Sequence, residues 1–187
     1  MASVLVPLAE GFEEIEAVAL IDIMRRGGID VRSAYLDGEF ETDLVLGANG
    51  ITLQADISMK SIAIDDFDMI VLPGGWGGTN RLAENLIVQR VLKEFKDSDK
   101  WIGAMCAAPY ALHVAGVLSH NYTCYPSVEE KIRDDGYTDK EKVVVDGKVI
   151  TSRGPGTAIC FALAIVKELV GVESYEAVKS GTLSDFC

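Results

Sequence analysis

Residues 101–109 read WIGAMCAAP, and they place a cysteine where a predicted strand runs into a predicted helix. Ala104 and Ala108 lie two residues on either side of Cys106, which is the spacing of a nucleophile elbow, a sharp turn that tolerates little bulk. A helix start beside the sulfur favours the thiolate, so we expect a reactive Cys106 with a pKa below the ~8.5 of free cysteine. The alternative for this stretch alone is a buried structural cysteine.

Strand patterns alternate with helical patterns on both sides of this elbow. The predicted strands are Val4–Leu8, Val31–Leu36, Met69–Leu72, Ile102–Met105, Val143–Val145 and Lys148–Thr151. The predicted helices are Glu13–Arg26, Asn80–Lys96, Ala107–Ala115 and Gly156–Val170, and Asp43–Leu53 is predicted as a hairpin turning near Asn49-Gly50. This alternation predicts one α/β domain over residues 1–187, with a mostly parallel sheet and helices on both faces.

Composition and charge narrow the class of partner. The chain has 187 residues, 49% of them hydrophobic, which predicts a globular domain. Its formal net charge of −12 argues against nucleic acid or an anionic membrane surface as a partner. No apolar run approaches the roughly 20 residues of a membrane span, and the strand-like N-terminus indicates that there is no signal peptide.

The cysteines and histidines carry little sign of metal binding. Cys106, Cys124, Cys160 and Cys187 show no Cys-x-x-Cys spacing, so we expect four free thiols in a reducing cytoplasm. The chain has two histidines, which supports a zinc site poorly, and we expect no metal. His113 would project from the elbow helix two turns beyond Cys106, and His120 falls in a predicted loop, so a structural or solvent-facing role is favoured for both.

Two further segments end near the same sheet edge as Cys106. Gly74 and Gly75 follow a buried strand, where glycines let the backbone approach a ligand, and with the N–H of Ala107 they could form an oxyanion hole. A glycine-rich connector is the alternative. Glu16 lies near the boundary of the apolar face of its helix, and a half-buried carboxyl there would have a raised pKa.

Other polar residues of these segments have plainer interpretations. Acidic residues in a first helical turn are favourable for electrostatic reasons alone, which explains Glu13 and Glu14 without a function. Arg153 precedes a helix and could help to bind an anion, but a simple helix start explains the segment equally well.

Taken together, the segments resemble the ThiJ/PfpI superfamily, and specifically its DJ-1 branch. The resemblance covers nearly the whole chain and consists of five motifs in order. They are Gly11–Val18 (GFEEIEAV), Met24–Ile29 (MRRGGI), Val71–Gly75 (VLPGG), Ala104–Pro109 (AMCAAP) and Thr151–Thr157 (TSRGPGT). The resemblance implies a flavodoxin-like three-layer sandwich and a homodimer. It also implies a peroxide-sensitive cysteine at Cys106, a hydrogen bond to it from Glu16, and oxygen binding by the N–H groups of Gly75 and Ala107.

The chain departs from its relatives at three places. Where some members carry a histidine before a proline, this chain has Tyr125, so a Cys-His dyad is not expected and the mechanism must depend on Glu16. Ala107 follows the cysteine where the protease-like branch has histidine, which argues against a peptidase. Asn49 stands near the position of an arginine that some members direct across the dimer.

The resemblance implies a cofactor-independent, glutathione-independent glyoxalase, with a deglycase activity on glycated thiols and amines as a related possibility. Cys106 would attack the aldehyde of methylglyoxal, and Glu16 would move the proton between adjacent carbons before lactate is released. The alternative is an oxidation-sensing, stress-protective protein in which Cys106 becomes a sulfinate without turnover. Both hypotheses use the same cysteine, so the sequence does not separate them.

Overall fold

The computed structural model describes residues 1–37 and 42–187, which form a mostly parallel sheet flanked by helices. The main sheet, in this described part, contains β1 (Ser3–Leu8), β2 (Asp30–Tyr35), β5 (Ile57–Ser58), β6 (Met69–Leu72), β7 (Trp101–Met105), β8 (Val143–Asp146) and β9 (Val149–Ser152). Their order across the sheet is β5-β2-β1-β6-β7-β9-β8, and β8 runs antiparallel to β9. A separate antiparallel hairpin joins β3 (Leu44–Leu46) to β4 (Thr52–Gln54), as predicted.

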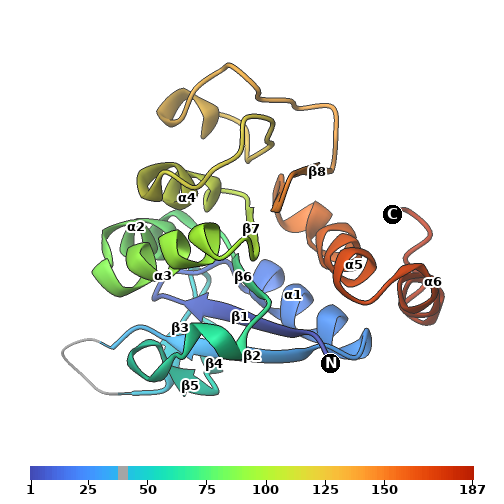
Figure 1. Ribbon diagram of the computed structural model, residues 1–187, viewed down its shortest axis with the longest axis horizontal. Helices are drawn as coiled ribbons and strands as arrows, with labels where there is room; N and C mark the ends of the chain where they lie inside the picture. Colours follow the sequence, from blue (N-terminus) through green and yellow to red (C-terminus); the bar gives the residue numbers. More distant parts are fainter. Residues whose placement is uncertain (38–41) are drawn as a thin grey trace.

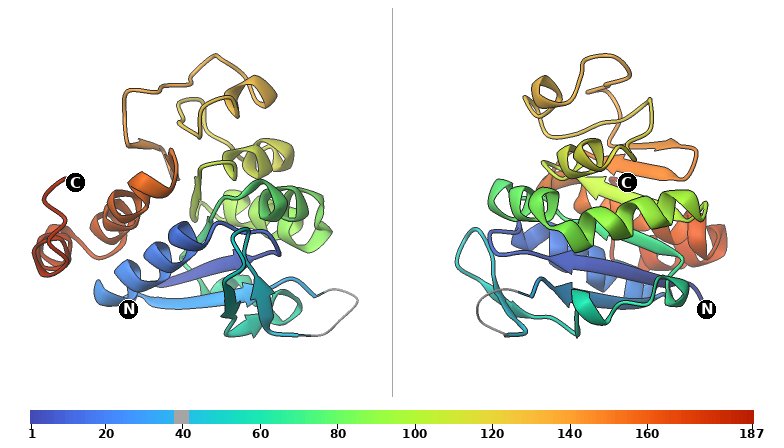
Figure 2. Two further views of the ribbon diagram at one scale, coloured as in Figure 1. Left: turned by 180° about the vertical axis from the view of Figure 1, so that it is seen from behind. Right: turned by 60° about the vertical axis from the view of Figure 1, so that its left-hand side comes forward.

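The helices form the two outer layers (Figure 1). They are α1 (Glu14–Arg26), α2 (Trp76–Glu84), α3 (Leu86–Asp97), α4 (Pro109–Ala115), α5 (Ala158–Leu169) and α6 (Val172–Gly181). One layer is built from α1, α5 and α6, and the other from α2, α3 and α4, as the turned views in Figure 2 also show. The predicted three-layer α/β architecture is therefore confirmed.

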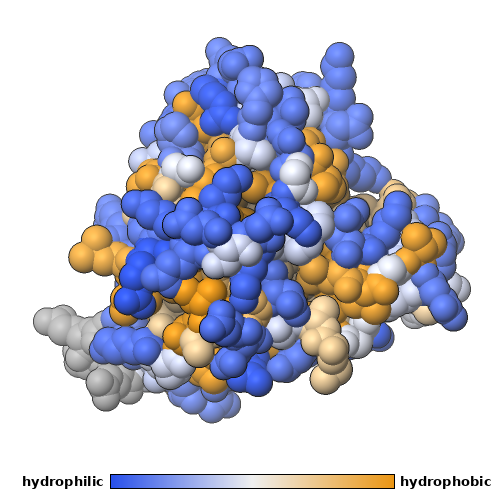
Figure 3. Space-filling model, in the orientation of Figure 1, coloured by the Kyte–Doolittle hydropathy of each residue, from blue (hydrophilic) through white to orange (hydrophobic). Residues whose placement is uncertain are grey.

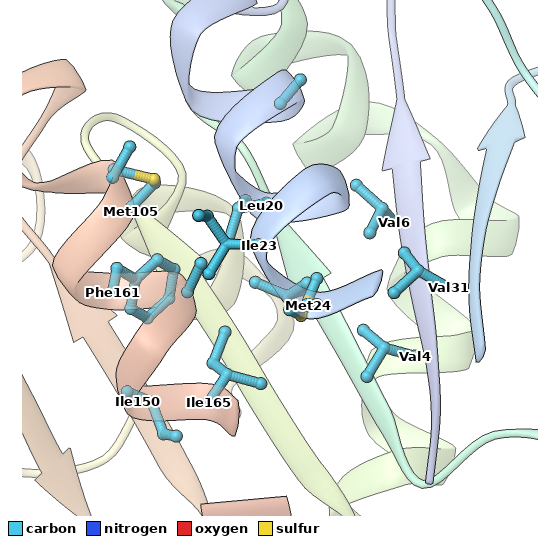
Figure 4. Close-up of a cluster of buried hydrophobic side chains, with 14 of the residues drawn as sticks. Val4, Val6, Leu20, Ile23, Met24, Val31, Met105, Ile150, Phe161 and Ile165 are labelled. Atoms are coloured by element: carbon cyan, nitrogen blue, oxygen red, sulfur yellow. The ribbon is translucent and has the colours of Figure 1, made fainter. Parts of the chain in front are cut away.

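Strand residues alternate between two hydrophobic cores, one on each face of the sheet. Val4 and Val6 of β1 belong to the core under α1 and α5, whereas Leu5 between them belongs to the core under α2, α3 and α4. Figure 4 shows the first core, with Met24 of α1 and Phe161 of α5 directed toward the sheet. Because side chains alternate along a strand and both faces are covered, the strands are continuous apolar runs.

The strand order positions the carboxyl ends of three strands for a binding site. The chain moves outward from β1 to β2, then crosses back to β6 and continues to β7 and β9. In doubly wound sheets, ligands bind at the point where the order reverses, here between β1 and β6. The loops after β1, β6 and β7 lead to Glu16, Gly74 and Cys106, so the topology brings these three residues to one edge.

Some element boundaries differ from the prediction. The predicted helix Asn80–Lys96 is two helices, because Asn85 adopts an extended conformation and caps α3 through its side chain, which accepts the N–H groups of Ile87 and Val88 at 3.0 and 3.1 Å. The helix after the elbow begins at Pro109 rather than at Ala107. Strand β5 and helix α6 were not predicted.

The prediction of four free thiols is wrong for two of the cysteines. Cys160 and Cys187 form a disulfide with a Cα–Cα distance of 5.1 Å, while Cys106 and Cys124 are free and buried. Helix α6 packs against α5 and the last residues turn back toward it, with the N–H of Cys187 bonded to the Ser184 carbonyl at 3.0 Å. The 27-residue separation leaves no local sequence motif, so only the packing of α6 reveals the pair. With this disulfide the cysteine content no longer argues for a reducing compartment.

We expect reduction of this disulfide to lower the free energy of unfolding by about 3–4 kcal/mol, the chain-entropy value for a loop of this length. Urea unfolding of the oxidised and reduced protein measures the change, and Cys187→Ser should match the reduced wild type. A reductant should then have no further effect on Cys187→Ser. Equal unfolding midpoints for oxidised and reduced wild type would contradict the prediction.

The surface is largely polar. On the face shown in Figure 3, hydrophilic residues dominate and apolar residues appear in patches between them. Among the helices of the described residues, none combines the length and the apolar character needed to cross a membrane.

Candidate active site

The structure places Cys106 at a tight elbow between β7 and α4. Its φ of +59° lies in the left-handed region, which is unfavourable for a residue with a side chain and is typical of functional sites. Both of its backbone groups are held: the N–H donates to the Ser152 carbonyl at 3.0 Å, and the carbonyl accepts the N–H of Tyr125 at 2.9 Å. The flanking Ala104 and Ala108 are fully buried. The elbow therefore presents the sulfur at the sheet edge while leaving 9% of the residue exposed.

Glu16 lies beside the sulfur and is completely buried, rather than half-buried as expected. Its Oε2 accepts the N–H of Gly74 at 2.7 Å, and its carboxyl is hydrogen-bonded to the Cys106 thiol. Its Oε1 is buried and has no hydrogen-bond partner among the described residues. A carboxyl with one oxygen fixed and the other unpaired is positioned to exchange a proton with a bound molecule.

The glycines of the β6 loop bring backbone N–H groups to this pair. A Cβ atom on Gly74 would lie 2.6 Å from the Cβ of Cys106 and 2.8 Å from Glu16 Oε2, so only glycine fits there. Gly75 has a φ of +84°, and its N–H and that of Ala107 are hydrogen-bonded to the Cys106 sulfur. Gly75 and Ala107 thus form a two-donor site at the sulfur, whereas the N–H of Gly74 holds Glu16 instead.

Burial is the largest influence on the pKa values of Glu16 and Cys106. Burial raises the pKa of Glu16 to about 7, against the lowering effect of its hydrogen bonds with Gly74 and Cys106. Burial, and next the charge of Glu16, raise the pKa of the Cys106 thiol to about 12, although the N–H groups of Gly75 and Ala107 act to lower it. The charge of Glu16 opposes the thiolate only while Glu16 is ionised. Because each group shifts the pKa of the other, the two titrations are linked.

The expectation that the pKa of the Cys106 thiol lies below that of free cysteine is therefore wrong, and burial is the main reason. The helix after the elbow begins at Pro109, so its first N–H groups do not lie directly at Cys106, and burial outweighs the effect of the helix. A thiolate can form by transfer of the thiol proton to Glu16, and this transfer joins the two residues into one chemical unit.

Glu13 and Glu14 have specific structural roles that the sequence interpretation missed. The side chain of Glu13 caps α1 by accepting the N–H of Glu16 at 2.8 Å. Glu14 is buried, and its carboxylate accepts the backbone and side-chain N–H groups of Asn49 at 2.5 and 2.9 Å. Burial acts to raise the pKa of Glu14, but the hydrogen bonds from Asn49 and Ile51 outweigh it and lower that pKa. Glu14 thereby fastens the β3–β4 hairpin to the start of α1.

The side chains of the remaining candidate residues are not among the groups that act on the Cys106 thiol. His113 is exposed on α4, and His120 is exposed 3.9 Å from Asp135. Tyr125 is half-exposed and its ring lies against Gly154. Among the groups that act on the Cys106 thiol in the described part of the chain, neither histidine is present.

Comparison with known proteins identifies the family. Residues 2–168 match the sequence pattern of the DJ-1/PfpI family. The chain belongs to the DJ-1/PfpI family. Its fold matches the crystal structure of Drosophila melanogaster DJ-1beta with a TM-score of 0.92 and 41% identity, over 97% of each chain. The family resemblance noted from the five motifs is therefore confirmed.

Two relatives in the DJ-1/PfpI family have an activity in their names. Glutathione-independent glyoxalase DJR-1.2 of Caenorhabditis elegans is 38% identical over 173 residues, which cover 92% of this chain and 90% of the relative. Glutathione-independent glyoxalase DJ-1 of Schizosaccharomyces pombe is 35% identical over 185 residues, covering 95% and 96% of the two chains.

Proposed function

We propose that this DJ-1/PfpI protein is a glutathione-independent glyoxalase that converts methylglyoxal to lactate without a cofactor. The observation that carries the proposal is the hydrogen-bonded pair of Cys106 and Glu16, in which the buried carboxyl has a pKa of about 7. A general acid–base group works best when its pKa lies near the working pH. The names of the two glyoxalase relatives support the substrate class.

The first step joins the sulfur to the aldehyde carbon. The thiol proton passes through Glu16 to the aldehyde oxygen as the sulfur attacks, and a hemithioacetal forms. The N–H groups of Gly75 and Ala107, which contact the free sulfur, lie within reach of an oxygen on a carbon bonded to that sulfur and can stabilise its negative charge.

The second step moves one proton between neighbouring carbons. Glu16 removes the hydrogen of the hemithioacetal carbon, which leaves an enediolate, and returns a proton to the adjacent former ketone carbon. The product is a thioester of lactate on Cys106, and water hydrolyses it to lactate and the free thiol. Oxidation and reduction occur on adjacent carbons of one molecule, so no external electron carrier is needed.

The decisive experiment counts product molecules per protein. Wild-type protein with reduced Cys106 is incubated with excess methylglyoxal, a chelator and no added thiol, and lactate is measured over time. We expect many molecules of lactate per chain. Consumption of a single equivalent, with a stable adduct or an oxidised Cys106 in the peptide mass spectrum, would reject turnover and favour the stress-protective alternative.

We also propose that the protein is a homodimer formed through α1 and the β3–β4 hairpin. Ile15 and Val18 of α1 are 61% and 47% exposed, and Leu44, Leu46 and Ile51 of the hairpin region are 55%, 46% and 56% exposed. Glu14 holds these two segments together, so their apolar side chains support one self-complementary contact surface.

Light scattering tests the proposed dimer. The measured mass should be twice the chain mass for wild type and lower for Ile51→Lys. A monomeric wild type would reject the proposal.

A further inference from the structure

A small recess lies between the start of α2 and the start of α4 and is not used by the proposed reaction. Its volume is about 280 Å³, and its lining consists of Trp76 and Asn80 of α2, Tyr110 of α4 and Lys131 of the short helix Glu129–Lys131. Trp76 directly follows Gly75, and Tyr110 lies one turn beyond Ala107. Two of its lining residues therefore follow closely in the chain on Gly75 and Ala107, the residues whose N–H groups act on the Cys106 sulfur.

The walls of the recess are aromatic and its rim carries a cation. The rings of Trp76 and Tyr110 meet edge to face with centroids 6.0 Å apart, which ties the start of α2 to the start of α4. The ammonium group of Lys131 lies 5.7 Å from the centre of the Trp76 ring. A cation over an aromatic face is held near that position while it remains open to water.

The polar groups of the recess have no partners within the described protein. Within residues 1–37 and 42–187, Lys131 has no carboxylate at ion-pair distance, and the Asn80 amide and Tyr110 hydroxyl make no side-chain hydrogen bond. The neighbouring Glu129 carboxylate lies instead 3.8 Å from the sulfur of Cys124. Donors that have no partner in the described protein can bind a ligand in place of solvent at little cost.

The charge of the whole chain makes this arrangement selective. With a formal net charge of −12, the protein repels small anions, and Glu130 next to Lys131 is exposed. The Lys131 ammonium group, which pairs with no carboxylate of residues 1–37 and 42–187, offsets that repulsion locally at the recess. Lysine, amide and phenol donors around an apolar wall suit a carboxylate on a short carbon chain.

We propose that this recess binds the terminal carboxylate of a dicarbonyl substrate whose aldehyde reacts at Cys106. The proposal rests on the proposed glyoxalase function and narrows its substrate class to acidic compounds with neighbouring aldehyde and ketone groups. Dioxovalerate is such a compound, with two methylene groups between the ketone and the carboxylate. The same proton transfer and hydrolysis would convert it, with one water, to the corresponding hydroxy diacid, so no oxidant or reductant is required.

The test compares an anionic and a neutral substrate in matched variants. In Lys131→Met we expect kcat/KM for dioxovalerate to fall about fivefold, the effect of one unit charge at close range in water, while kcat/KM for methylglyoxal stays unchanged. Lys131→Arg should retain most of the preference, and Lys93→Met, at an exposed lysine of α3, should match wild type. Equal losses for both substrates, or no loss for either, would overturn the proposal.

A second measurement separates the recess from the catalytic proposal. Iodoacetate and iodoacetamide alkylate Cys106 and are similar in size, but only iodoacetate is charged. Lys131→Met should lower the ratio of the iodoacetate to the iodoacetamide rate about twofold, because iodoacetate feels the charge from a greater distance. If neither dicarbonyl is turned over but this ratio falls, the glyoxalase proposal fails and the anion recess stands. An unchanged ratio rejects the recess.

Discussion

Cys106→Ser is expected to reduce lactate formation to the uncatalysed background, a loss of at least about 10³-fold. The serine hydroxyl fits the elbow but is a far weaker nucleophile than a thiolate, and a carboxyl with a pKa of about 7 is too weak a base to ionise it. The measurement is lactate released from methylglyoxal per chain and per unit time.

The matched control for this variant is Cys124→Ala. Cys124 is the second free thiol and is fully buried, with Glu129 Oε2 3.8 Å from its sulfur. It has no place in the proposed reaction, so its removal should leave lactate formation near the wild-type rate. Activity that survives Cys106→Ser and disappears in Cys124→Ala would move the nucleophile to Cys124.

Glu16→Gln should lower kcat for lactate formation by about 10²–10⁴-fold, which is the usual contribution of a general acid–base group. Glutamine keeps the shape: its carbonyl can accept the Gly74 N–H, and its amide can donate to the Cys106 sulfur. It cannot take a proton from one carbon and return it to the next. Cys106 should therefore still be alkylated by iodoacetamide in this variant, while lactate formation is nearly lost.

Controls for Glu16 must avoid its two acidic neighbours. Glu13 caps α1 by accepting the N–H of Glu16, and Glu14 holds the β3–β4 hairpin, so changes at either residue disturb the site indirectly. Glu10→Gln, at an exposed position before α1, is the better control and should match wild type. If Glu16→Gln remains active and Tyr125→Phe does not, the tyrosine rather than the glutamate carries the proton.

Glu16→Gln, which should lower activity, should at the same time raise the stability of the fold. The folded-state pKa of Glu16, about 7, lies above its ordinary value of 4.5, so the protonated carboxyl stabilises the fold fully below pH 4.5 and this contribution is lost as the pH rises toward 7. Glutamine has no charge to bury. We expect Glu16→Gln, relative to wild type, to gain up to about 3 kcal/mol of unfolding free energy between pH 4.5 and pH 8. A pH-independent difference in urea unfolding would contradict the shifted pKa.

Several features follow from neighbouring residues alone. The alternation of apolar runs with helical patterns is enough to predict the parallel sheet and its two helical layers. The reason is that the spacing of apolar residues within each segment already distinguishes a helix from a buried strand. The small residues around Cys106 predict the elbow for the same reason: a turn with a φ of +59° leaves space for little else at those positions. The glycines at 74 and 75 likewise indicate a close backbone approach before any tertiary contact is known.

Other features required the tertiary structure, because they depend on groups far apart in the chain. The pKa of Glu16 is set by burial and by Gly74, 58 residues away, and that of Cys106 by burial and by Glu16. The Cys160–Cys187 disulfide depends on how α6 packs against α5. The anion recess joins α2, α4 and the segment at Lys131, none of which carries a local signal for a ligand. The burial of a carboxyl, the pairing of two cysteines and the position of donors for a ligand all depend on which residues are close in space. The order of residues along the chain does not specify those spatial neighbours.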